Sequence, residues 1–279
     1  MISQKQIRVV LAAFIALAIG LQSCNDKKVE DVINPNETGK ITLKFDNVVG
    51  TQDLQLNNRT YTNAAGEEFT VSMLNYFISN VVLIKEDGSE YIVPQADSYF
   101  LVKEEDAASQ RVTIDNVPAG NYTGVRFKIG VDSLRSTMPP AQRTGALDVG
   151  GSAQGMYWAW NSGYIFFKFE GTSPQAPAGN DGQKRFRYHI GGFGGYSSPT
   201  FNNIQSREIS FGRDKAVIRA SRTSDIHIIV DLLKVFNSAE TRVSIAANPT
   251  VMMAAYSVNI AKNYARTFEY DHLHNMSVQ

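Results

Sequence analysis

Apolar and polar residues alternate from Ile41 through Leu43 to Phe45, which is the two-residue period of a half-buried strand. Further short runs rich in Val, Ile, Phe and Tyr follow, separated by Gly, Pro, Asn and Asp. These patterns predict strands at 69–85, 91–93, 99–102, 111–114, 122–130, 164–170, 185–190, 207–211 and 226–233. The Asp87-Gly88 pair predicts a hairpin between the first two of them. So many short strands predict an all-β fold, an antiparallel two-sheet β-sandwich.

The C-terminal part of the chain contains one segment with helical spacing. Apolar residues recur there at steps of three and four after Asn248-Pro249, which predicts a short C-terminal helix over about 250–264. Long stretches without strand patterns predict loops, which in a sandwich often carry binding residues. The predicted long loops are 133–163, 171–183 and 191–203.

The first residues have the pattern of a targeting signal. Lys5 and Arg8 precede an apolar run that is too short for a membrane-spanning helix, and the run ends at Leu21-Gln22-Ser23-Cys24. This predicts a lipoprotein signal peptide over 1–23, with Cys24 as the acylated first residue of the mature chain; an ordinary secretory signal is the alternative. Polar residues 24–40 predict a flexible tether, and 41–279 the folded domain.

Charge and cysteine content narrow the function classes. The chain has 27 Lys plus Arg and 27 Asp plus Glu, so it lacks the basic surplus that nucleic-acid binding needs. A single Cys excludes an internal disulfide framework and a Cys-rich zinc site. We therefore expect a membrane partner through the N-terminal lipid, and no nucleic acid.

Catalytic signatures are absent or weak. There is no Gly-x-Ser-x-Gly elbow and no His-Glu-x-x-His helix, and the glycine-rich stretch 191–195 is not followed by Lys-Ser/Thr. A nucleophilic triad stays open, because its members need not be close in sequence. Asp132 and Asp148 could hold calcium or cap turns, and turn capping is favoured. We expect a protein that is not an enzyme.

The chain has only four histidines. His272 and His274 lie two residues apart, so an extended backbone would put both imidazoles on one face, about 7 Å apart at Cα. Two such rings can bind one copper, zinc or nickel ion, and Asp271 could ligate or orient an imidazole; a solvated tail is the alternative. His189 could be a third ligand or a core histidine, with the core favoured. His227 alternates with isoleucines and is expected to be structural or solvent-facing.

The two tryptophans, Trp158 and Trp160, are two residues apart, so an extended backbone would put both on one face. Core or rim packing explains such a pair by itself. Stacking on a sugar or oxidative chemistry would need a separate observation.

The segment around these tryptophans, 155–168 (Gly-Met-Tyr-Trp-Ala-Trp-Asn-Ser-Gly-Tyr-Ile-Phe-Phe-Lys), resembles the signature of the MbnP-like copper-binding proteins. Other blocks resemble that family in the same order along the chain, over roughly 40–275. They are Tyr76-Phe77-Ile78-Ser79-Asn80, Ile129-Gly130-Val131-Asp132-Ser133, Gly145-Ala146-Leu147-Asp148, Phe186-Arg187-Tyr188-His189-Ile190-Gly191-Gly192 and Asp271-His272-Leu273-His274-Asn275.

This resemblance implies an extracytoplasmic β-sandwich that binds copper through two histidines and a tryptophan oxidised to kynurenine by a dihaem peroxidase-like partner. It makes His189, His272 and His274 the candidate metal ligands and Trp158 or Trp160 the candidate for oxidation. Neutral imidazoles and an aromatic amine suit copper, and a site without thiols avoids thiol oxidation outside the cell.

We therefore expect a copper-binding lipoprotein at the outer membrane or periplasmic face of a Gram-negative bacterium, acting in copper acquisition, storage or handover. Two alternatives remain. One is a surface lipoprotein that binds carbohydrate or protein through its aromatic loop, without metal. The other is a substrate of a dihaem enzyme whose redox site is the tryptophan pair.

Overall fold

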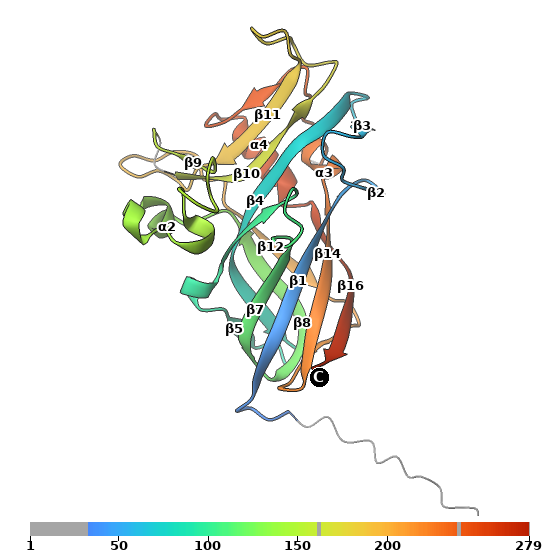
Figure 1. Ribbon diagram of the computed structural model, residues 1–279, viewed down its shortest axis with the longest axis vertical. Coiled ribbons are helices and arrows are strands. Elements are labelled where there is room, and N and C mark those ends of the chain that lie inside the picture. Colours follow the sequence, from blue (N-terminus) through green and yellow to red (C-terminus); the bar gives the residue numbers. More distant parts are fainter. Residues whose placement is uncertain (1–32, 161–162, 239–240, 279) are drawn as a thin grey trace, which may run out of the picture. The chain divides into compact units, whose positions relative to one another are not determined.

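The structure, a computed structural model, describes residues 33–160, 163–238 and 241–278. Its strands form two sheets, which confirms the predicted β-sandwich (Figure 1). The predicted signal peptide and Cys24 lie outside the described residues. The first strand, β1 (Thr38–Val49), begins three residues before the predicted start of the domain at 41. No described helix is long and apolar enough to cross a membrane.

The smaller sheet has five strands and is built around β1. β14 (Arg222–Asp231) lies parallel to β1, and β16 (Phe268–Ser277) forms the edge beyond β14. β7 (Arg111–Pro118) and β2 (Gln52–Asp53) pair with the opposite side of β1. The parallel β1–β14 pair makes this sheet mixed, whereas the alternation predicted antiparallel sheets.

The larger sheet is built around its longest strand, β4 (Glu68–Lys85). This strand confirms the one predicted at 69–85. β4 pairs with β5 (Glu90–Ile92), so the predicted hairpin is also confirmed. The other strands of this sheet are β3 (Thr60–Thr62), β6 (Tyr99–Lys103), β8 (Gly120–Ile129), β9 (Tyr157–Trp158), β10 (Gly163–Thr172), β11 (Arg185–Gly191), β12 (Gln205–Ser210), β13 (Ala216–Ile218) and β15 (Thr250–Val251).

Within residues 33–160, 163–238 and 241–278, helices are few and short. The α-helices are α2 (Ser133–Thr137), α3 (Leu233–Phe236) and α4 (Ser257–Tyr264), and the 3₁₀ turns are Gln95–Asp97, Pro140–Gln142 and Gly145–Leu147. The helix predicted over 250–264 is thus confirmed only in its second half. Its first part joins the large sheet, because Pro249 O accepts a hydrogen bond from Arg187 N at 2.7 Å and β15 pairs in parallel with β11.

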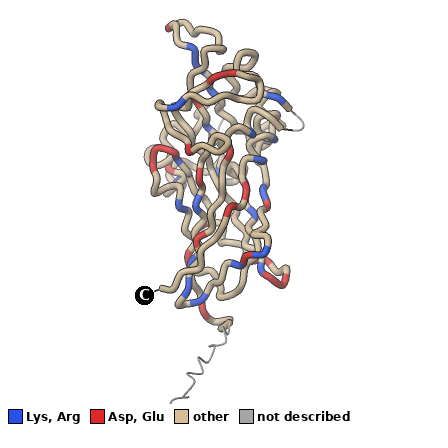
Figure 2. Tube along the Cα trace, turned by 90° about the vertical axis from the view of Figure 1, so that its right-hand side faces the viewer, with Lys and Arg blue, Asp and Glu red and all other residues tan. Residues whose placement is uncertain are grey.

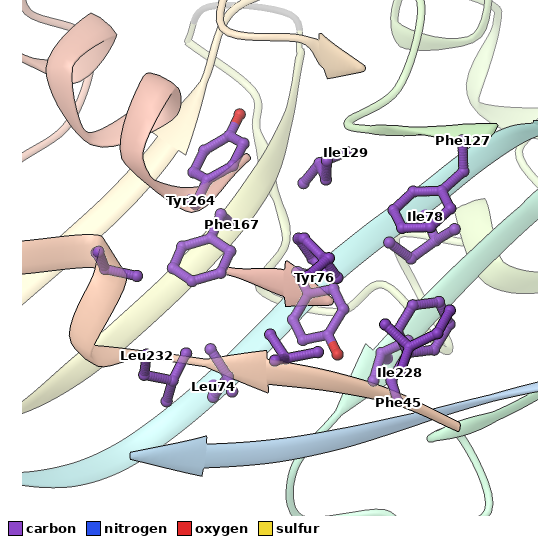
Figure 3. Close-up of a cluster of buried hydrophobic side chains, with 14 of the residues drawn as sticks. Phe45, Leu74, Tyr76, Ile78, Phe127, Ile129, Phe167, Ile228, Leu232 and Tyr264 are labelled. Carbon is purple, nitrogen blue, oxygen red and sulfur yellow. The ribbon is translucent and has the colours of Figure 1, made fainter. Parts of the chain in front are cut away.

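The core lies between the two sheets and combines aliphatic side chains with a network of aromatic rings (Figure 3). Phe45 of β1 contacts Tyr76 of β4 and Phe127 of β8, with ring centroids 6.1 and 5.9 Å apart. Phe268, the first residue of β16, contacts all three of these rings. Since aromatic pairs add stability beyond the area they bury, this contact fixes the start of β16. The edge strand that carries two of the four histidines is therefore anchored in the core.

The two aspartates considered as calcium ligands both cap turns. The Asp132 carboxylate accepts from Arg135 N at 3.0 Å at the start of α2, and Asp148 accepts from Gly150 N at 2.9 Å. These bonds are the ordinary use of aspartate at helix starts and tight turns. They agree with the interpretation favoured from the sequence.

Candidate metal centre

An irregularity in the pairing of β14 with β16 shapes the candidate site. Ile226 pairs with Leu273 and Ile228 with Tyr270, so β14 has one residue, His227, where β16 has two, Asp271 and His272. A bulge of this kind inserts an extra residue and re-aims its neighbours. Here Asp271 is the extra residue, and His272 stays on the same face of the sheet as His227.

Three imidazoles converge on this outer face. The ring centroids of His227 and His272 are 4.1 Å apart, and His274 lies 4.9 Å from His272 and 5.6 Å from His227. One ring nitrogen from each lies within 4.8 Å of the others. Two nitrogens bound to one metal ion are about 3–4 Å apart, so small side-chain rotations would bring all three to one ion.

Carboxylates flank the three imidazoles. The Asp271 carboxylate lies 2.8 Å from His272 Nδ1. If it accepts the Nδ1 proton, the Nε2 lone pair of His272 is free to bind a metal, as in many histidine sites. Asp225 pairs across the strands with His274, and its Oδ2 lies 4.0 Å from His227 Nε2.

The surroundings of His227 favour its neutral form. Burial lowers its pKa below the ordinary value, and His272 and Lys44 add to this effect. Asp225 and Asp46 oppose it. A lowered pKa leaves the ring mostly neutral at pH 7, and the neutral imidazole is the form that binds metal.

Basic and acidic residues are interspersed along the strands around the site (Figure 2). Lys44 of β1 pairs across the strands with His227, and its Nζ lies 3.4 Å from the Asp46 carboxylate. Arg111 of β7 lies 2.5 Å from Asp225 Oδ2. Both Lys44 and Arg111 therefore have carboxylate partners.

His189 lies elsewhere, on β11 of the larger sheet. Its Nε2 lies 2.7 Å from Glu170 Oε1 of β10, and Lys168 Nζ lies 3.7 Å from the same oxygen. This bond and the ion pair with Lys168 lower the pKa of the Glu170 carboxyl. The structure thus groups His272 and His274 with His227, the histidine expected from the sequence to be structural or solvent-facing, and gives His189 a carboxylate partner.

The tryptophan pair lies at the larger sheet, with Trp158 on β9 and Trp160 in the turn that follows. Trp158 is 7% exposed and packs against Gly191, where a Cβ would lie only 2.8 Å from the indole. Trp160 is 68% exposed, with its ring 5.4 Å from that of Trp158. Lys168 Nζ donates to Gly155 O at 3.1 Å and so ties this loop to β10. Figure 1 shows β9 and β16 on opposite sides of the domain.

The sequence pattern did not identify His227 as a candidate ligand. It lies between Ile226 and Ile228, a spacing that equally fits any outward-facing polar residue of a strand. The sequence feature that could have indicated the cluster is a pair of strands, one with a single outward-facing histidine and one with a His-x-His pattern. Only the pairing of β14 with β16 brings the two patterns together.

Fold and site together define a β-sandwich protein with a three-histidine surface cluster whose donor set suits a late transition metal. The MbnP family model matches residues 38–253, so the chain belongs to the MbnP family and the resemblance in its sequence is confirmed. The match ends before His272 and His274.

One solved structure, MbnP from Methylosinus trichosporium, is similar to this chain at 16% sequence identity and a TM-score of 0.47. The similarity covers 78% of this chain and 82% of that one. No curated protein matches the chain significantly.

Proposed function

We propose that this protein binds copper through His227, His272 and His274 and acts in copper acquisition, storage or handover. The observation that carries the proposal is the convergence of three imidazoles on one face of β14 and β16, in a chain of a family associated with copper. Imidazole nitrogens suit copper, zinc and nickel, and the family favours copper among them. His227 replaces His189 in the ligand set implied by the resemblance.

The proposal includes a lipid anchor on Cys24 and a place at the outer membrane or on the periplasmic face. The pattern of residues 1–24 supports both. The protein itself is proposed to have no enzymatic activity. It would hold the ion at a surface site from which another molecule can take it.

A dihaem peroxidase-like partner that oxidises a tryptophan remains part of the proposal. Trp160 is the better target, because its indole is largely exposed whereas that of Trp158 is buried. Mass spectrometry of the peptide that holds both residues, from protein made in its own host, tests this step. A mass that corresponds to kynurenine at Trp160 supports it, and unmodified tryptophan at both positions contradicts it.

The test of copper binding is elemental analysis of the full-length protein from its host membranes. We compare the wild type with a His272→Ala, His274→Ala double variant and with His189→Ala as the matched control. The expected result is near-stoichiometric copper in the wild type and in His189→Ala, and loss of copper in the double variant. Copper retained in the double variant and lost in His189→Ala would contradict the proposed ligand set.

The second candidate function is binding of carbohydrate or protein through the aromatic loops. Two exposed aromatics favour it: Trp160 at 68% exposure and Tyr196 at 72%, each in one of the predicted loops. Wild-type protein that contains no metal, together with binding that Trp160→Ala abolishes, would favour this function over copper binding.

A further inference from the structure

Asp225 is an unusual neighbour for a histidine cluster. The residue is 6% exposed, and its Oδ1 is buried without a hydrogen-bond partner among the described residues. The other oxygen, Oδ2, lies 2.5 Å from Arg111 Nη2 and 4.0 Å from His227 Nε2. The same carboxylate oxygen therefore lies close to a guanidinium and to one imidazole of the cluster.

Such an arrangement is costly for the fold alone. A buried charged oxygen without a partner loses its hydration and gains nothing in return. The Arg111 pair offsets only part of this cost, since the Arg111 side chain is 46% exposed. A positive ion held by the neighbouring imidazoles would give the carboxylate a second charge partner.

We infer that Asp225 and Arg111 together set the preference of the histidine site between divalent and monovalent copper, an inference that rests on the proposed function. The Coulomb energy between a fixed charge and an ion scales with the charge of the ion. The Asp225 carboxylate therefore favours Cu(II) over Cu(I), and Arg111, which carries the opposite charge, moderates that preference.

The remaining charges near the cluster do not cancel this effect. Lys44 and Asp46 form their own ion pair, with opposite signs at similar positions. Asp271 is bonded to His272 and adds to the negative field. Asp225 is the most buried of these carboxylates, so water screens it least.

The size of the effect follows from distance. For a charge about 6 Å from the ion and an effective dielectric constant of about 40, the interaction changes affinity about tenfold for a monovalent ion. For a divalent ion the energy doubles, and the change is about a hundredfold. The difference, about tenfold, corresponds to about 59 mV in the Cu(II)/Cu(I) midpoint potential.

The experiment uses the full mature protein loaded with copper, as Asp225→Asn and Arg111→Gln variants. Cu(II) and Cu(I) affinities are measured against competing chelators and the midpoint potential by redox titration. Asp225→Asn should raise the potential by about 59 mV and weaken Cu(II) more than Cu(I). Arg111→Gln should lower the potential by a smaller amount, because that side chain is half exposed.

Opposite signs distinguish charge from structure, because a variant that merely distorts the site would weaken both ions alike. Asp115→Asn is the matched control: Asp115 pairs with Lys40, about 13 Å along β1 from Lys44, and its variant should leave the potential unchanged.

Shifts of the same sign in the two test variants, or equal losses for both ions, overturn the inference while copper binding stands. If Asp225→Asn does not fold, Arg111→Gln decides alone, and an unchanged or raised potential overturns the inference. A wild type without copper would instead overturn the proposed function.

Discussion

His189 and His227 look alike in the sequence and differ in the structure. Each lies within a strand, between residues that are buried, and each presents its ring to the outer face of a sheet. His189 has a carboxylate, Glu170, at 2.7 Å on the neighbouring strand. His227 instead has two further imidazoles beside it.

The difference lies in the neighbouring strand. On β10 the residue within reach of His189 is Glu170, which gives the imidazole Nε2 a hydrogen-bond partner. That nitrogen is therefore not free to bind a metal ion. On β16 the residues within reach of His227 are His272 and His274, so that three imidazoles face one another. What a strand histidine can do is therefore decided by its cross-strand partners.

The largest expected effect is on copper binding. Its absence would contradict the distinction between His227 and His189. His227→Ala removes one of three proposed ligands and should weaken copper binding by more than about a hundredfold, because loss of a supporting residue alone costs 10–100-fold. His189→Ala should leave the affinity unchanged. Chelator competition measures both. Equal losses in the two variants, or a loss only in His189→Ala, would contradict the assignment of His227.

The second prediction compares the carboxylates bonded to the two kinds of histidine. Asp271→Asn should reduce copper affinity about tenfold, because Asp271 orients His272 and supports its Nε2 as a ligand. Glu170→Gln should not change copper affinity. Glu269→Gln, on β16 and ion-paired with Lys234, controls for the removal of a negative charge near the site. A loss in Glu269→Gln as large as in Asp271→Asn would show that charge alone is responsible.

The fold was largely predictable from the sequence because period-2 patterns and turn residues are local. The strands around Phe45, Tyr76 and Phe127 follow directly from alternation. β16 does not, because its outer face is polar and only Phe268 is fully buried, so the strand reads as a solvated tail. Register is a long-range property, and the bulge at Asp271 that aligns His227 with His272 has no sequence signal of its own.

The tryptophan segment shows the same limit. Its residues pointed to the family, and the family model confirms that resemblance. Which tryptophan is exposed depends on Gly191, more than thirty residues away, which leaves room for the Trp158 indole. Spacing within the segment could not distinguish Trp158 from Trp160.

The third prediction concerns how much the contacts of Glu170 with His189 and Lys168 contribute to stability. Glu170→Gln replaces a charged partner of His189 and Lys168 and should lower the free energy of unfolding by about 1 kcal/mol. Glu208→Gln, whose side chain is 58% exposed in its pair with Arg126, should cost less than about 0.5 kcal/mol. Urea denaturation of the metal-free proteins measures both. Equal costs would mean that the Glu170 pair is an ordinary surface contact.

The smallest expected effect is a difference in the pH dependence of stability between the His227 and Glu170 regions. His227 has a lowered pKa in the folded protein, so the unfolded chain binds more protons, and its contribution to stability is lost as pH falls below about 6.5. Glu170 also has a lowered pKa, but its contribution persists to about pH 4.5 and is lost only below that. In metal-free protein, His227→Gln should therefore flatten the stability profile just below about pH 6.5. Glu170→Gln should change the slope only below about pH 4.5, where its carboxyl would have been protonated. Thermal unfolding of the two variants across this pH range measures the slopes. If both substitutions changed the stability profile over the same pH range, the two histidine regions would not be electrostatically distinct.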